Sequence, residues 1–179
     1  MMRIEKGSHR LVFIFERYVF KFPRLDRAGM AIAIILKTLK DTVSCELKWR
    51  KIKRVIREFR SMLIGGIIEN KEEYRTWKTL RADFLARIVF GSRLMNVQVR
   101  CHGQLLTSED EKRFKEMKQI IGVDVARINP HWWDEDNFLE ENGRIVVLDY
   151  GDGLDPDHLP LKDFLVRHRG VLQKFMLNK

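Results

Sequence analysis

Cysteine, proline and glycine are scarce in this chain of 179 residues, which has two cysteines, four prolines and eleven glycines. Cys45 and Cys101 are too few for a disulfide framework and form no CxxC pair, which also argues against a zinc cluster. We therefore expect a protein of the reducing cytoplasm. With 45% hydrophobic residues, the chain is neither disordered nor collagen-like. Its length predicts a single domain over residues 1–179.

Long apolar runs are also missing. The longest, residues 28–36, is far too short to cross a bilayer. The first ten residues lack the apolar core of a signal peptide. We expect neither a membrane span nor a secretion signal.

Charge is unevenly distributed along the chain. The net charge is +9, but residues 131–163 hold ten acidic and two basic residues. Gathered carboxylates repel one another unless a cation offsets them, and Mg²⁺ prefers carboxylate oxygens. The acidic segment is therefore either a metal-binding segment or a solvated acidic loop.

The hydrophobic pattern predicts several β-strands. Aromatic and β-branched runs indicate strands at residues 10–15, 18–22, 87–90 and 95–101. The first two are separated by two residues, which indicates a β-hairpin. Another hairpin is predicted around Asn142 and Gly143, between residues 138–139 and 145–148.

Helical patterns fill most of the remaining chain. Helices are predicted at residues 27–40, 46–62, 70–80, 107–121 and 161–176. The first of these is rich in Ala, Met, Ile and Leu, which favours a buried helix. Gly65 and Gly66 are expected to interrupt the helical structure, and Asn70 to cap the helix that follows.

The helix predicted at residues 46–62 has two unlike faces. One is a hydrophobic stripe of Trp49, Ile52, Ile56, Phe59 and Leu63. The opposite side is basic and consists of Lys48, Arg50, Lys51, Lys53, Arg54, Arg57 and Arg60. This basic helix, residues 48–60, either binds a nucleic acid or an acidic protein partner, or is a solvated face on a packed helix.

The order of these elements resembles that of the protein-kinase-like superfamily. Tyr-Val-Phe-Lys-Phe, residues 18–22, resembles the strand that ends in the phosphate-binding lysine, here Lys21. Residues 73–80 resemble the helix in which a glutamate, here Glu73, pairs with that lysine. Glu72 is adjacent but faces roughly 100° away around the helix. Taken singly, these segments are also typical of an edge strand and an ordinary amphipathic helix.

The strongest part of the resemblance begins at Asp136-Asn137-Phe-Leu and ends at Asp149-Tyr-Gly. It is similar to the metal-binding stretch of protein kinases, aminoglycoside phosphotransferases and small lipopolysaccharide or RIO-type kinases. The resemblance implies that Asn137 and Asp149 hold Mg²⁺ and that Lys21 and Glu73 bind ATP. The alternative is a polar hairpin that ends in an Asx turn.

The chain departs from the family at the catalytic base. Active kinases have an aspartate five residues before the metal-binding asparagine, where this chain has Trp132, whose indole cannot accept a proton. His131 or Asp134 would then have to act as a displaced base, although Asp136 is nearer still. Packing is the alternative role for His131 and for the tryptophan pair at 132–133.

Other family features are reduced. Where kinases have a glycine-rich phosphate loop, this chain has only Gly7 and Ser8. Only 30 residues follow Asp149, fewer than the helical lobe of a kinase would need. Residues 24–66 form an insertion between the lysine strand and the glutamate helix. The chain is similar in these respects to the minimal kinase-like proteins of phages and bacterial secreted effectors.

These features predict an α+β fold, namely a minimal protein-kinase-like fold. It would have a small antiparallel-sheet lobe, a reduced helical lobe and the helical insertion at residues 24–66. The favoured function is that of a pseudokinase, a degenerate kinase that binds ATP and Mg²⁺ and acts mainly as a binding or regulatory module. The alternatives are an active minimal ATP-dependent kinase and a basic nucleic-acid-binding protein.

Overall fold

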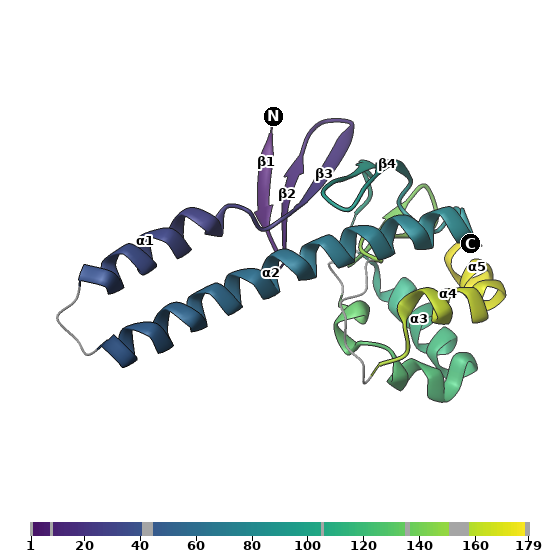
Figure 1. The fold of residues 1–179 in the computed structure, drawn as a ribbon. Helices are drawn as coiled ribbons and strands as arrows, with labels where there is room; N and C mark the ends of the chain where they lie inside the picture. The colour runs from purple at the N-terminus through teal and green to yellow at the C-terminus, as the bar shows by residue number, and fades with distance from the viewer. Residues whose placement is uncertain are drawn as a thin grey trace.

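The computed structural model describes residues 2–7, 9–40, 45–104, 106–134, 137–150 and 158–177. The fold mixes helices with an antiparallel sheet, in agreement with the predicted α+β class. Figure 1 shows an N-terminal sheet, a long pair of helices beside it and a mainly helical C-terminal part. Among the described residues, none of the helices is both long and apolar enough to cross a membrane.

Five antiparallel strands form the N-terminal sheet in the order β1–β2–β3–β5–β4. They are β1 (Arg3–Lys6), β2 (Arg10–Ile14), β3 (Tyr18–Pro23), β4 (Ile88–Gly91) and β5 (Asn96–Val99). The last four confirm the predicted strands. The sequence did not predict β1, whose four residues include a single apolar side chain, Ile4. Across the sheet, Lys21 is paired with Val12 on one side and Asn96 on the other.

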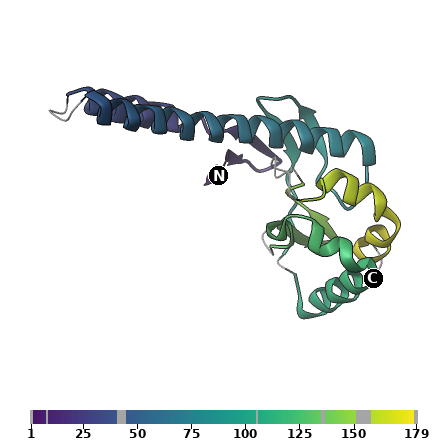
Figure 2. The ribbon, with the colours of Figure 1, turned by 60° about the horizontal axis from the view of Figure 1, so that its bottom comes forward.

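Two antiparallel helices, α1 (Arg27–Lys40) and α2 (Cys45–Leu80), run side by side and project beyond the sheet (Figures 1 and 2). The predicted break at Gly65 and Gly66 is wrong, because α2 is one continuous helix of 36 residues. Asn70 is not a cap either. It is buried within α2, and its side-chain amide donates to the carbonyl of Lys21 at 3.3 Å.

Close packing explains why glycines occur inside α2. A Cβ atom at Gly66 would lie 2.5 Å from the carbonyl oxygen of His9 and 2.8 Å from the Cα of Pro23. Glycine lowers helix stability by about 1 kcal/mol relative to alanine, but here it lets the sheet approach the helix backbone. The glycine pair therefore marks a contact and not a helix end.

Helix α1 has the predicted bounds but not the predicted burial. Of its 14 residues only Thr38 is buried. Ile32, Leu36 and Leu39 are each more than half exposed. An apolar composition on all sides usually indicates a buried helix, and this rule fails here because α2 covers only one side of α1.

The C-terminal part is built on a helix and a hairpin. Helix α3 (Ser108–Ile121) begins at Thr107, which forms a capping box with Asp110, as an acid-led helix predicts. The hairpin of β6 (Phe138–Glu141) and β7 (Arg144–Val147) confirms the predicted turn. Asn142 and Gly143 form this turn with positive φ angles of 55° and 83°.

The last predicted helix is divided in two, α4 (Leu161–Arg167) and α5 (Arg169–Leu177). Two short 3₁₀ helices, Gly122–Arg127 and Pro130–Trp133, connect α3 to the hairpin. These elements enclose the main hydrophobic core, which also includes the chain that follows α2.

An aromatic cluster occupies this core. The ring of Trp132 lies 4.5 Å from that of Trp133, 5.4 Å from that of Phe138 and 5.7 Å from that of Phe164, measured between centroids. Only 6% of Trp132 is exposed. Packing, the alternative considered for the tryptophan pair, is therefore what the structure shows.

Candidate functional site

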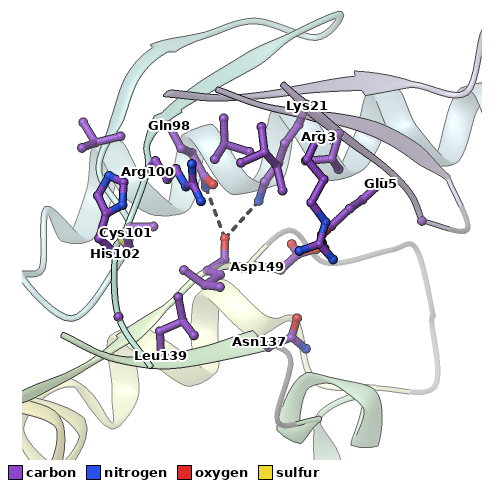
Figure 3. A pocket seen from close by; sticks show the side chains of 18 of the residues that line it. Arg3, Glu5, Lys21, Gln98, Arg100, Cys101, His102, Asn137, Leu139 and Asp149 are labelled. Atoms are coloured by element: carbon purple, nitrogen blue, oxygen red, sulfur yellow. Dashed lines mark hydrogen bonds and ion pairs between the residues drawn. The ribbon is translucent and has the colours of Figure 1, made fainter. Parts of the chain in front are cut away.

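A cavity of about 930 Å³ lies between the sheet and the β6–β7 hairpin (Figure 3). Strands β1, β2, β3 and β5 form one wall, and the hairpin with Leu148 and Asp149 forms the other. Residues 100–103, which leave the sheet after β5, close one end. Ligand pockets for small molecules commonly have volumes of roughly 300–1,000 Å³, so a nucleotide-sized molecule fits.

Part of the cavity is apolar on both sides. Val12 and Val19 contribute from the sheet, and Leu139 and Leu148 contribute from the hairpin side. Aliphatic side chains on two facing walls suit a flat, largely apolar ring.

A buried ion pair joins the sheet to α2 beside this cavity. Lys21 lines the cavity, and its Nζ lies 2.6 Å from Oε1 of Glu73, which is fully buried. The predicted contact between these two residues is confirmed. Glu72 turns away and pairs with Arg75 at 3.0 Å, so the helix phase was also predicted correctly.

Glu73 accepts hydrogen bonds from three further side chains. Its Oε2 accepts from Arg10 and from Asn96, both at 2.9 Å. Its Oε1 also accepts from Gln98 at 3.1 Å. A buried carboxylate is costly unless it is paired and hydrogen-bonded, and Glu73 meets both conditions.

The sheet also holds the chain just before Asp149. The carbonyl oxygen of Leu148 accepts from Lys21 at 3.0 Å and from Gln98 at 3.4 Å, as the dashed lines in Figure 3 show. On the other side of Asp149, the hydroxyl of the buried Tyr150 donates to the carbonyl of Ala86 at 2.5 Å. Burial raises the pKa of Tyr150, so the hydroxyl keeps its proton. Both neighbours of Asp149 are thus fixed, which positions its carboxylate at the cavity wall.

Arg10, which sequence reasoning missed, connects the acidic residues of the site. Its guanidinium hydrogen-bonds to Asp149, contacts Glu73 at 2.9 Å and lies 3.1 Å from Glu69. Burial alone would lower the pKa of Arg10, but the carboxylates of Asp149, Glu73 and Glu69 outweigh burial and raise it. Arg10 is the first residue of β2, and its only sequence signal was a basic residue at the start of an apolar run.

Asn137 lines the same cavity as Asp149. Its side-chain Nδ2 donates to the carbonyl oxygens of His131 at 2.9 Å and Trp132 at 3.4 Å. Because Nδ2 is held there, the amide oxygen is turned away from those carbonyls. The backbone carbonyl of Asn137 accepts from Leu148 at 2.8 Å, which ties the two sides of the hairpin together at this point.

The two residues implied as metal ligands offer one carboxylate and one amide oxygen. Oxygen ligands of this kind suit Mg²⁺, although Arg10 already binds Asp149. Within the described ranges, no group of three or more His, Cys, Asp or Glu side chains could hold a metal ion. Asp136 lies outside the described residues. The donors among the described residues therefore fit a metal that shares its coordination with phosphate oxygens and water.

The side chains of the two candidates for a displaced base pair with each other at the protein surface. Nδ1 of His131 is 3.2 Å from Oδ2 of Asp134, and both side chains are largely exposed. Neither is among the residues that line the cavity. Trp132, at the position where kinases have the catalytic aspartate, is directed into the aromatic core.

Basic side chains dominate the polar part of the cavity wall. Lys21, Arg3, Lys6 and Arg100 line it, against the carboxylates of Glu5 and Asp149. Arg3 and Glu5 are paired at 2.9 Å. Such an excess of positive charge favours an anionic ligand.

No protein-family model matches the chain, and no curated protein is significantly similar to it. The resemblance to kinases therefore depends on the residues and contacts described above.

Proposed function

We propose that the protein is a kinase-like ATP-binding protein that acts mainly as a binding or regulatory module and transfers phosphate weakly or not at all. One observation carries this proposal. Lys21, which the buried Glu73 holds from behind the wall, lies on one wall of a nucleotide-sized cavity, and Asn137 and Asp149 lie on the other. These four side chains come from β3, α2 and the two sides of the β6–β7 hairpin, in the order found in kinases.

The cavity offers separate surroundings for the two ends of ATP. The adenine ring fits between Val19 on the sheet and Leu139 on the hairpin, where the walls are apolar. The phosphates fit near the ammonium of Lys21, which Glu73 holds in place. Mg²⁺, when bound with the nucleotide, would offset phosphate charge between Asn137 and Asp149. The protein's own part is to position these groups.

Weak transfer is proposed because, among the described residues, neither candidate for the missing base lines the cavity. His131 and Asp134 bind each other at the surface, and Trp132 is part of the core. Loss of a positioned acid or base typically lowers a rate by about a hundredfold to ten-thousandfold. The contact between Arg10 and Asp149 further favours binding over turnover, because it engages the carboxylate that the metal needs.

Calorimetric titration of the purified full chain with ATP and Mg²⁺ tests the proposal. Wild type should bind, and Lys21→Met should bind about tenfold to a hundredfold more weakly, because a hydrogen bond to a charged group contributes about 1.5–3 kcal/mol. Lys78→Met removes the same charge from an exposed position on α2 and should bind like wild type. Melting temperatures verify that each variant is folded.

Two results would change the conclusion. If wild type binds no ATP at millimolar concentration, the proposed site is wrong. If it binds ATP and also transfers radiolabelled phosphate at a robust rate, nucleotide binding stands but the protein is an active minimal kinase.

A further inference from the structure

The α1–α2 hairpin exposes apolar side chains that the proposed nucleotide site does not use. On α1, Ile32, Leu36 and Leu39 are each more than half exposed. Their spacings of four and three residues place them on one side of the helix. The other side, around Thr38, is the one that packs against α2.

Helix α2 adds two apolar residues in the same region. Trp49 and Ile56 are seven residues apart, hence on one side of the helix, and each is at least half exposed. The predicted hydrophobic stripe is therefore divided, because Ile52 is buried against α1 while Trp49 and Ile56 are not. Lys48, predicted on the opposite side, instead reaches α1 and donates to the carbonyl of Leu39 at 3.3 Å.

Both sets of residues lie on one face of the hairpin. At about 100° per residue, Ile56 and Trp49 lie roughly 40° and 60° around α2 from the buried Ile52. Ile32 and Leu39 lie roughly 120° and 100° around α1 from the buried Thr38, turned in the same sense. The two helices are antiparallel. An angle counted around each helix axis, from its packing side and in the direction of the chain, therefore leads to the same face of the helix pair. We call this the hairpin face; it consists of Ile32, Leu36, Leu39, Trp49 and Ile56.

Basic residues border the hairpin face. Lys53 follows Trp49 by four residues and Arg60 follows Ile56 by four, so each is the helical neighbour of an apolar side chain. Residues 27–64 contain ten Lys and Arg against three Asp and Glu, a net charge of +7. The surface thus combines exposed hydrophobic side chains with strong positive charge.

We propose that the hairpin face binds an anionic lipid surface, with α1 and the first half of α2 lying in the plane of the interface. Amphipathic helices with Trp, Leu and Ile beside Lys and Arg bind there, because the acyl region takes the apolar side chains and anionic headgroups attract the basic ones. A second copy of the chain would bring together two hairpins, residues 27–64, that each carry a net charge of +7 and repel each other. A nucleic acid would attract the basic residues but would leave most of the five apolar side chains exposed.

Vesicle co-sedimentation of the full chain tests the proposal. The protein should sediment with phosphatidylcholine vesicles that contain phosphatidylglycerol and not with phosphatidylcholine alone, and added salt should weaken the binding. The variant Ile32→Ser/Leu36→Ser/Trp49→Ser should bind at least about tenfold more weakly. So should Lys53→Glu/Arg60→Glu, because each basic residue near such a surface contributes about a fivefold gain.

Control variants carry the same changes outside the hairpin. Leu94→Ser/Val123→Ser/Val166→Ser alters three exposed apolar residues, and Arg93→Glu/Lys115→Glu reverses two exposed charges. Both should bind like wild type, and melting temperatures show whether all variants fold.

Three results would overturn the proposal. The first is wild type that fails to bind anionic vesicles. The second is binding that depends on Lys53 and Arg60 but not on the apolar residues, together with a shift of labelled DNA or RNA in a gel, which would indicate a nucleic-acid surface. The third is that wild type sediments as a dimer and the triple Ser variant as a monomer in sedimentation velocity, which would indicate that a second copy covers the face.

Discussion

The guanidinium of Arg10 is hydrogen-bonded to the carboxylate of Asp149, so a cation from the protein itself occupies one side of the residue implied as a metal ligand. Arg10 also contacts Glu73 at 2.9 Å, and through that carboxylate it is connected to Lys21. Strand β2, helix α2 and the chain after β7 are thus joined by one charged network. The network offsets the charge of Asp149 without a metal.

Substitution of Arg10 by glutamine should make nucleotide binding more dependent on Mg²⁺. Without the guanidinium, the protein offsets less of the charge of Asp149, so a metal bound there contributes more to nucleotide binding. We expect the ratio of the ATP dissociation constants in EDTA and in Mg²⁺ to rise several-fold in Arg10→Gln, measured by calorimetry. Arg17→Gln changes an exposed arginine at the other end of the β2–β3 hairpin and should keep the wild-type ratio. An unchanged ratio in Arg10→Gln would show that Arg10 does not compete with the metal.

Loss of Glu73 should destabilise the fold strongly. Glu73→Ala leaves the buried Lys21 and Arg10 without their shared carboxylate, and removal of one partner from a buried pair costs about 3–5 kcal/mol. Glu72→Ala removes a partly exposed pair with Arg75 and should cost less than about 1 kcal/mol. Urea unfolding of both variants measures the difference. Equal losses would mean that the Glu73 pair is not the buried anchor of the site.

The kinase resemblance was sufficient to predict that four residues lie close together, while their role in binding stays a prediction. Lys21, Glu73, Asn137 and Asp149 could be found because each lies in a local pattern, either an apolar strand, a helix or a hairpin. Arg10 and Gln98 could not, because they reach the site only through the pairing of β2 and β5 with β3. Strand pairing joins residues that are distant in sequence, and a single sequence does not reveal it.

The helical hairpin shows where local propensity misleads. Gly65 and Gly66 predict a helix end because glycine is unfavourable in helices, yet contact with His9 and Pro23 requires the absence of a side chain at Gly66. The bounds of α1 follow from composition, but its exposure does not. Burial depends on what packs against a helix, and α2 covers only one side of α1.

Two glycine-to-alanine substitutions separate the effect of helix propensity from that of close packing. Gly66→Ala should destabilise the protein, because the new Cβ would lie 2.5 Å from the carbonyl oxygen of His9. Gly29→Ala, in α1, meets no atom within 4 Å and should stabilise by about 0.5–1 kcal/mol through helix propensity. Thermal unfolding of the two variants should therefore show shifts of opposite sign. A stabilising Gly66→Ala would mean that α2 and the sheet are not in close contact there.

Asp124 should contribute to stability in a manner that depends on pH. Oδ2 of Asp124 lies 3.0 Å from Nε2 of His168 and 2.7 Å from Nη1 of Arg167, and these partners lower the pKa of Asp124 to about 2. A carboxylate with a lowered pKa stabilises the folded state above its usual pKa of about 3.9, and this contribution is lost as the pH falls toward 2.

Asp124→Asn should therefore be less stable than wild type at neutral pH. The difference in melting temperature should shrink as the pH falls from about 4 to about 2, where the wild-type carboxylate gains its proton. Asp83→Asn, at an exposed position, should differ little from wild type over this range. A difference that stays constant with pH would show that the contribution of Asp124 is not electrostatic.

Restoring the family's catalytic residue by Trp132→Asp should not create an active kinase. The side chain would point into the cluster of Trp133, Phe138 and Phe164, where an unpaired carboxylate is costly and the lost indole alone removes about 3–5 kcal/mol. Trp132→Phe keeps an aromatic ring there and should lose less stability. Urea unfolding and transfer of radiolabelled phosphate measure both effects. A folded Trp132→Asp protein with more turnover than wild type would mean that the side chain at this position reaches the cavity, and that the indole limits phosphate transfer.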